Sequence, residues 1–141
     1  MKQPDKISKI QSQKLIRYYF EIAEEDLKTV NALFEGKRYY ACLFFLHLVI
    51  EKILKAIVVQ KINIAPPLTH DLVLLSELAN IDLSPKQIDL LRIINQFNIR
   101  TRYDDYKKSF YKLATYNYTL EYLNKGKKII LWLKQFMPSK K

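Results

Sequence analysis

Three polar side chains recur at four-residue spacing within one of the most apolar stretches of the chain. His47, Glu51 and Lys55 lie in the segment 39–59, whose other residues are mostly aliphatic or aromatic. Residues four apart lie on one face of a helix, so the three side chains form a single polar line. A buried charge needs a partner, and Glu51 precedes Lys55 in the order that favours an ion pair. The line either borders a polar cleft or is a solvated stripe that carries an ordinary ion pair.

A second polar cluster follows an apolar helical pattern near residue 100. Its members are Asn95, Asn98, Arg100, Arg102, Tyr103, Asp104, Asp105 and Tyr106. If Ile88 and Leu91 face the core, both asparagines face inward as well. Arginine suits phosphate because its planar fork donates two parallel hydrogen bonds. The cluster predicts a polar pocket at the end of a helix. The alternative is that Arg102 pairs with a neighbouring aspartate and only caps the helix.

Several familiar catalytic and ligand-binding patterns are missing from the chain. Two glycines cannot form a glycine-rich phosphate loop, and no Gly-x-Ser-x-Gly elbow is present. One cysteine and two histidines give no zinc spacing. We therefore expect no metal and no cofactor. Cys42 lies in an apolar run and is expected to be a small buried hydrophobe rather than a nucleophile.

The composition and the hydrophobic periodicity predict an all-α protein. Hydrophobic residues make up 49% of the chain, which contains only 2 glycines and 5 prolines, so long helices with short loops are favoured. Apolar spacings of three and four predict helices over 12–34, 37–61, 84–100 and 116–137, with a short helix capped by Thr69. The segment 101–114 is expected to be a loop, either without helix or with one helical turn.

These elements predict an antiparallel up-and-down helical bundle of four to five helices. The segment 37–61 is apolar on nearly all sides, so its helix is expected to be central. Gly126 lies on the inner stripe of the last helix, where it can allow a neighbouring helix to approach closely. The domain is expected to span 12–137, with flexible ends at 1–11 and 138–141.

Positive charge is concentrated at the two ends of the chain. The net charge is +10, and residues 107–141 alone carry nine lysines and one acidic residue. In an antiparallel bundle the terminal helices often lie side by side, so the two ends can form one basic face. Such a face suits the phosphate backbone of a nucleic acid. The alternative is a lysine-rich surface that only aids solubility.

The sequence also predicts a cytoplasmic protein without a membrane segment. The segment 1–13 is polar and lacks the apolar core of a signal peptide. The longest apolar stretch, 39–50, is too short to span a bilayer. A single cysteine cannot form an internal disulfide, which fits a reducing compartment.

Five segments match, in order and spacing, those of a known family of helical bundles. They are Ala23–Leu27, Gly36–Ala41, Ile50–Ala56, Pro67–Leu72 and Asn95–Tyr103. The first three resemble the opening two helices of HEPN domains, with the Glu-Lys-x-Leu-Lys-Ala piece as the most specific. The fourth is similar to the family's Thr-His turn. The fifth resembles the Asn…Arg-Tyr-Pro-Asp segment of one bacterial and archaeal subgroup.

The resemblance implies an up-and-down bundle that is commonly a homodimer and is associated with nucleotide or RNA binding. Many members pair with a minimal nucleotidyltransferase as toxin and antitoxin. The resemblance further implies that active members are metal-independent ribonucleases. Their motif is an arginine followed about four to six residues later by a histidine, which transfers the proton. Arg100 or Arg102 can supply that arginine. However, His47 and His70 both lie upstream, and Asp104 replaces the subgroup's proline.

Because histidine normally transfers the proton near neutral pH, this departure predicts a module without nuclease activity. Some family toxins are silenced by nucleotidylation of a tyrosine near the arginine. The resemblance places Tyr103 or Tyr106 in that neighbourhood.

Three functions remain open. The first is a non-catalytic HEPN-like module that binds nucleotide or RNA. The second is a metal-independent endoribonuclease toxin in which His47 or His70 reaches Arg102 in space. The third is an interaction subunit that docks on a nucleotidyltransferase partner. All three predict a homodimer on the basis of the resemblance. The binding residues expected for the first are Arg102, Tyr103, Arg100, Asn98, Asn95, Glu51, Lys55 and His47.

Overall fold

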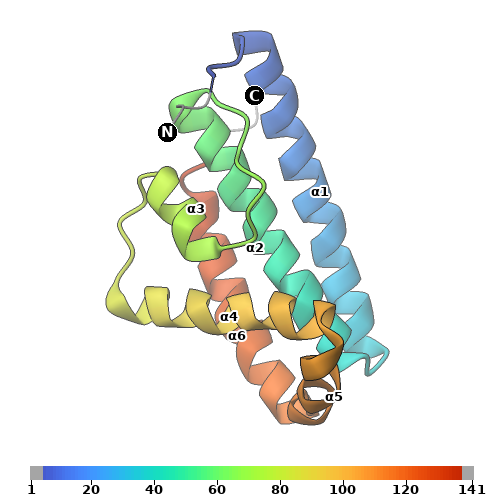
Figure 1. Ribbon diagram of the computed structural model, residues 1–141. Helices are drawn as coiled ribbons and strands as arrows, with labels where there is room; N and C mark the ends of the chain where they lie inside the picture. Colours follow the sequence, from blue (N-terminus) through green and yellow to red (C-terminus); the bar gives the residue numbers. More distant parts are fainter. Residues whose placement is uncertain (1–4, 138–141) are drawn as a thin grey trace.

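The chain forms a bundle of six α-helices, seen in a computed structural model that describes residues 5–137 (Figure 1). The all-α fold class is confirmed, with six helices where four to five were predicted. Within residues 5–137 the only β-structure is a single antiparallel bridge between Lys6 and Ile64. The helices are α1 (Lys9–Glu35), α2 (Tyr39–Ile62), α3 (Leu72–Leu78), α4 (Pro85–Arg102), α5 (Asp104–Leu113) and α6 (Tyr116–Lys134).

The central element is α2, as the sequence predicted. It contacts each of the other five helices, and α1 lies alongside it over most of its length (Figure 1). Most of its residues from Cys42 to Val59 are buried. A helix that is apolar all round is stable only when neighbours cover every side, and here α1, α6 and the crossing helix α4 do so. Cys42 is fully buried, and burial raises the pKa of its thiol to about 11, so it is the small hydrophobe that was expected.

The ends of α1 and α4 are set by reciprocal side-chain caps. At α4, Ser84 accepts from the backbone N–H of Gln87 while the Gln87 side chain accepts from the N–H of Ser84, as its sequence predicted. Ser8 and Gln11 form the same box at α1. Each box gives hydrogen-bond partners to two backbone N–H groups that would otherwise be unsatisfied at the helix end. Because of its box, α1 starts at Lys9, three residues before the predicted start.

The predicted cap of α3 and the predicted loop at 101–114 were both wrong. Asp71 caps α3, since its carboxylate accepts from the N–H groups of Val73 and Leu74, whereas the Thr69 hydroxyl accepts from the N–H of Asp71 itself. Residues 104–113 form α5. Phe110 is fully buried and stacks on Phe97 at 5.6 Å between ring centroids. Phe110 is the one large inward side chain that holds this short helix. A single apolar position gives no hydrophobic periodicity, so the sequence did not reveal the helix.

Gly126 brings α6 against α2, as expected. A Cβ atom built on Gly126 would lie 2.7 Å and 2.8 Å from the two Cδ atoms of Leu46, which is fully buried. The inner face of α6 therefore has no room for a side chain at this position.

We predict that Gly126→Val lowers the free energy of unfolding by about 2 kcal/mol, because the new side chain overpacks the contact with Leu46. Chemical denaturation measures it. Asn124→Val, at an exposed site in the same helix, is the matched control. In the double variant with Leu46→Ala, the combined loss is expected to be smaller than the sum of the two single losses. Simple additivity would mean that the two positions do not compete for the same space.

Candidate functional site

The polar line of α2 is buried, and its centre is the Glu51 carboxylate. The Glu51 side chain is 0% exposed. Its Oε1 accepts a hydrogen bond from His70 Nδ1 at 2.6 Å, and its Oε2 lies 3.2 Å from Lys55 Nζ and 3.4 Å from Lys52 Nζ. His47 is also fully buried and Lys55 nearly so, so the alternative of a solvated stripe is wrong.

Burial would by itself raise the pKa of the Glu51 carboxyl. The hydrogen bond from His70 and the positive charges of Lys55 and Lys52 outweigh that effect, so the pKa of Glu51 lies below its ordinary value. The carboxyl is therefore ionised at neutral pH, and the cations around it are partners that the charge requires.

His70 reaches Glu51 because the segment between α2 and α3 folds back along α2. At the end of α2, Asn63 adopts a left-handed conformation with φ 51° and ends the helix. Two prolines, Pro66 and Pro67, prevent a new helix from starting at once. The Thr69 hydroxyl then accepts from the N–H of Asp71, which makes a tight turn around His70. The His70 side chain remains 48% exposed at the edge of the site.

The protonation of His47 follows from its two neighbours. Its Nε2 lies 2.8 Å from the carbonyl oxygen of His70, which can only accept, so Nε2 carries the hydrogen. Its Nδ1 is then free to accept a hydrogen bond from Asn98 Nδ2, at 3.4 Å. Burial lowers the pKa of His47, and the opposing effect of Glu51 does not reverse it. His47 is a neutral imidazole that joins α2 to the returning segment and to α4.

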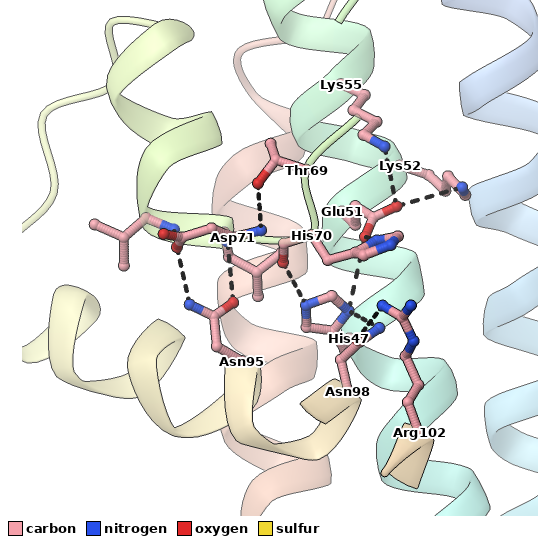
Figure 2. Close-up of polar contacts among 12 residues, drawn as sticks. His47, Glu51, Lys52, Lys55, Thr69, His70, Asp71, Asn95, Asn98 and Arg102 are labelled. Carbon is pink, nitrogen blue, oxygen red and sulfur yellow. Dashed lines mark hydrogen bonds and ion pairs between the residues drawn. The ribbon is translucent and has the colours of Figure 1, made fainter. Parts of the chain in front are cut away.

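Arg102 is the exposed end of this chain of contacts. Its Nη1 lies 3.4 Å from Oδ1 of Asn98, whose amide nitrogen faces His47 (Figure 2). Asn98 is buried, whereas Arg102 is largely exposed. The Asn98 amide thus contacts one terminal nitrogen of the guanidinium, and Arg102 has no other hydrogen bond or ion pair with the side chains that the structure describes, which do not include that of Asp104.

Asn95 has a structural position rather than a place beside Arg102. Its Oδ1 accepts from the N–H of Leu72 at 3.0 Å, and its Nδ2 donates to the Asp71 carboxylate at 3.0 Å (Figure 2). The amide therefore completes the N-terminal cap of α3 and fastens that helix to α4.

The structure separates Arg100 and Tyr103 from the buried network. Arg100 lies close enough to Tyr118 of α6 to oppose the rise that burial causes in the pKa of that phenol. Tyr103 is 55% exposed and Tyr106 is exposed as well, so both rings are on the surface at the start of α5. Of the eight predicted site residues, five belong to one contact network, in which His70 links Glu51 to His47: His47, Glu51, Lys55, Asn98 and Arg102.

Two members of the network, His70 and Lys52, were not among the predicted binding residues. The Thr-His-Asp sequence after two prolines was a signal for His70, but nothing in it showed where the ring points. On the side of α1, burial raises the pKa of Asp26 while Lys52 opposes that rise, and Lys52 lies 6.0 Å from the Tyr19 ring centroid. The site is therefore walled by α1, α2, α4 and the segment before α3.

The network can bind an anion but is not arranged to hold a metal. Lys52, Lys55 and Arg102 supply three positive charges, and Glu51, Asp26 and Asp71 supply three carboxylates around them. Within residues 5–137 no group of three or more histidine, cysteine or acidic side chains is close enough to ligate a metal ion. An exposed guanidinium suits a phosphate group, because its planar fork donates parallel hydrogen bonds.

A basic, aromatic cavity continues the same face of α2 toward its first turn. Its volume is about 410 Å³, and it is lined by Arg38, Tyr40, Lys107, Lys108 and Tyr111. The rings of Tyr40 and Tyr111 meet edge to face at 5.8 Å. Tyr40 and His47 are seven residues apart, so both lie on one face of α2 at a separation of about 10 Å along the axis.

The chain belongs to the HEPN domain family, whose model matches residues 16–136. The match covers most of α1 and all of α2, the returning segment and α4, which are the elements that build the polar network. No match was found among the curated proteins or among the solved structures. Within the described part of the chain, no helix combines the length and the apolar character needed to cross a membrane.

We predict that Glu51→Gln lowers the free energy of unfolding by about 3 kcal/mol, because it leaves Lys55 buried without a counter-charge. Glu121→Gln is a matched control: Glu121 pairs with Lys125 at the same four-residue spacing and at 2.8 Å, but both side chains are about half exposed. The loss of unfolding free energy in Glu121→Gln should be much smaller. Equal losses in denaturant unfolding would show that burial of the Glu51 pair is irrelevant.

We also predict that His47 makes the protein less stable in weak acid. Its folded pKa is depressed, so below the ordinary value of 6.5 the unfolded chain binds a proton that the folded chain does not. Stability contributed in this way is present above pH 6.5 and falls by up to about 1.4 kcal/mol per pH unit below it. The free energy of unfolding of His47→Gln should depend less on pH than that of the wild type between about pH 6.5 and pH 5, which is above the range where carboxylates titrate. Ile94→Val weakens the core without removing a titrating group and should keep the wild-type slope.

Proposed function

We propose that the protein is a non-catalytic, cytoplasmic HEPN module that binds the phosphate groups of a nucleotide or RNA at Arg102. The observation that carries the proposal is the exposed Arg102 guanidinium, held at the end of the Glu51–His70–His47–Asn98 chain of hydrogen bonds. A guanidinium that is already held at one terminal nitrogen loses less conformational entropy when its other N–H groups bind an anion. HEPN domains are associated with nucleotide- and RNA-related roles, which agrees with this chemistry.

RNA fits the surface better than a mononucleotide does. The basic, aromatic cavity beside α5 lies about 10 Å along α2 from the level of His47, so a ligand needs more than one phosphate to contact both places. Cationic side chains along the path of the phosphate backbone, together with aromatic rings on which bases stack, are typical of proteins that bind single-stranded nucleic acid. The net charge of +10 favours the same class of ligand.

The absence of a histidine after Arg102 supports a binding role rather than catalysis. His47 is close to Arg102 through Asn98, but it is fully buried and both ring nitrogens have partners. Such an imidazole cannot reach the proton of a substrate. We propose that the module acts as one half of a toxin–antitoxin-type pair, as a homodimer that associates with a nucleotidyltransferase. Light scattering at micromolar concentration tests the dimer.

We predict that Arg102→Ala weakens binding of a short single-stranded RNA about tenfold or more, because charge-assisted hydrogen bonds to phosphate are lost. Calorimetry at fixed salt measures the affinity. Arg92→Ala is the control, since Arg92 is an exposed arginine of α4 that pairs with Asp89. Unchanged affinity in a folded Arg102→Ala protein would exclude the site. A similar loss of affinity in both variants would mean that RNA binding depends on the total charge of the protein and not on Arg102 in particular.

A metal-independent ribonuclease is the second candidate, and one contact favours it. Glu51 accepts from Nδ1 of His70 at 2.6 Å, which orients a ring that is about half exposed and whose Nε2 has no hydrogen-bond partner among residues 5–137. A carboxylate–imidazole pair of this kind can serve as a general base. The test is RNA cleavage in the presence of a chelator. Cleavage that disappears in His70→Ala but survives in His47→Gln would establish this function, and no cleavage would exclude it.

A further inference from the structure

A groove lies between α4 and α6, on the far side of α4 from the polar network. Its volume is about 730 Å³. The apolar side chains that line it are Leu90, Ile93, Tyr122, Ile129 and Trp132. Ile93 and Asn98 are five residues apart, which places them roughly 140° apart around the helix. The groove and the site at Arg102 therefore use different faces of α4.

The groove exists because α4 and α6 meet around Phe97 and then separate. Phe97 and Tyr122 meet edge to face at 5.5 Å, and Phe97 also contacts Tyr118. From this contact α4 runs across the long helices instead of beside α6 (Figure 1). None of the helices that the structure describes covers the apolar stripe along the first half of α4, and Ile93 is 37% exposed. An exposed apolar groove with a polar rim is typical of an interaction site.

The rim of the groove is positively charged. Three lysines, Lys86, Lys125 and Lys128, stand around it with one acidic residue, Asp89. Lys125 already pairs with Glu121 at 2.8 Å. Lys86 and Lys128 are exposed and have no ion pair with any residue that the structure describes. The rim therefore has unpaired positive charge on both helices.

We propose that this groove binds an acidic amphipathic helix of a partner protein. The apolar face of such a helix would lie on Leu90, Ile93 and Trp132, and its acidic residues would pair with Lys86 and Lys128. A helix that lays its apolar face in a groove with complementary charges at the rim is a recurrent mode of protein recognition. Trp132 supplies the large aromatic anchor that dominates the energy of many interfaces.

Neither the rest of the chain nor a second copy supplies that acidic helix. Residues 1–4 and 138–141 contain lysines and no acidic residue. The densest acidic segment, 21–26 in α1, has Glu24 paired with Lys134 and Glu25 paired with Lys28, and α1 packs on α2. A chain with a net charge of +10 also repels a second copy at a lysine-rimmed surface.

Trp132 gives a direct measurement, since it is the single tryptophan of the chain. The probe is a tryptophan-free synthetic helix of about 18 residues with leucines along one face and glutamates elsewhere. Its addition should change the Trp132 emission saturably. Two matched peptides are the ligand controls: one has glutamine in place of glutamate, and one has the same composition in scrambled order. Both should bind at least about tenfold more weakly.

The variants separate the rim from the total charge. Lys86→Glu with Lys128→Glu should weaken binding of the acidic helix about tenfold, whereas Lys9→Glu with Lys14→Glu, at exposed positions of α1, should not. Ile93→Ala tests the apolar lining without placing a charge in the groove. No saturable change in emission, equal binding of the control peptides, or equal effects of the two charge reversals would each overturn the proposal. Self-association that the groove variant abolishes would instead assign the groove to a second copy.

Discussion

The ionised Glu51 carboxylate in the middle of α2 is the constraint on which the arrangement of the polar site depends. A carboxylate removed from water must be paired and hydrogen-bonded, and a single helix cannot supply all its partners. Lys55 and Lys52 come from α2 itself, but His70 comes from the segment that follows it. Once His70 is held, its carbonyl oxygen is held as well, and this oxygen selects the tautomer of His47. That tautomer leaves Nδ1 free to accept from Asn98 and so links α4 to α2.

This arrangement is costly for a protein that needs only a stable core. Buried ion pairs are often no more stabilising than apolar side chains of the same size, because removing two charges from water offsets their attraction. The other inward positions of α2 are aliphatic and pack without such a cost. Charged groups kept inside a helix with so many apolar alternatives are best explained by the group they position, and ionisable residues with shifted pKa values gather at functional sites. The network reaches the solvent at Arg102 and at His70.

The sequence predicted the helical elements better than it predicted the directions of their side chains. Amphipathic periods revealed α4 and α6, a long run that is apolar on nearly all sides revealed α2, and spacing alone placed His47, Glu51 and Lys55 on one face. Arg100 and Arg102 could not be separated, because α4 was expected to end near Arg100, and the direction of a side chain beyond a helix end is undefined. Since α4 continues to Arg102, the two arginines lie about 200° apart around one helix and only Arg102 meets Asn98. His70 lies in an irregular segment, where no period reports orientation. Short α5 is held by Phe110 stacked on Phe97, a contact distant in sequence.

The position of α4 connects the apolar groove to the polar network. Phe97 and Asn98 are adjacent and both buried, yet Phe97 meets Tyr122 beside the apolar groove while Asn98 holds Arg102 beside the polar network. A small rotation of α4 would therefore move both contacts at once, because neighbouring residues of a helix cannot turn independently. If a partner in the groove changes the affinity for a phosphate ligand at Arg102, that ligand must change the affinity for the partner by the same factor, since coupling between two binding equilibria is reciprocal. A helix that crosses the bundle, rather than one that runs along it, is what gives both surfaces access to the same rigid element.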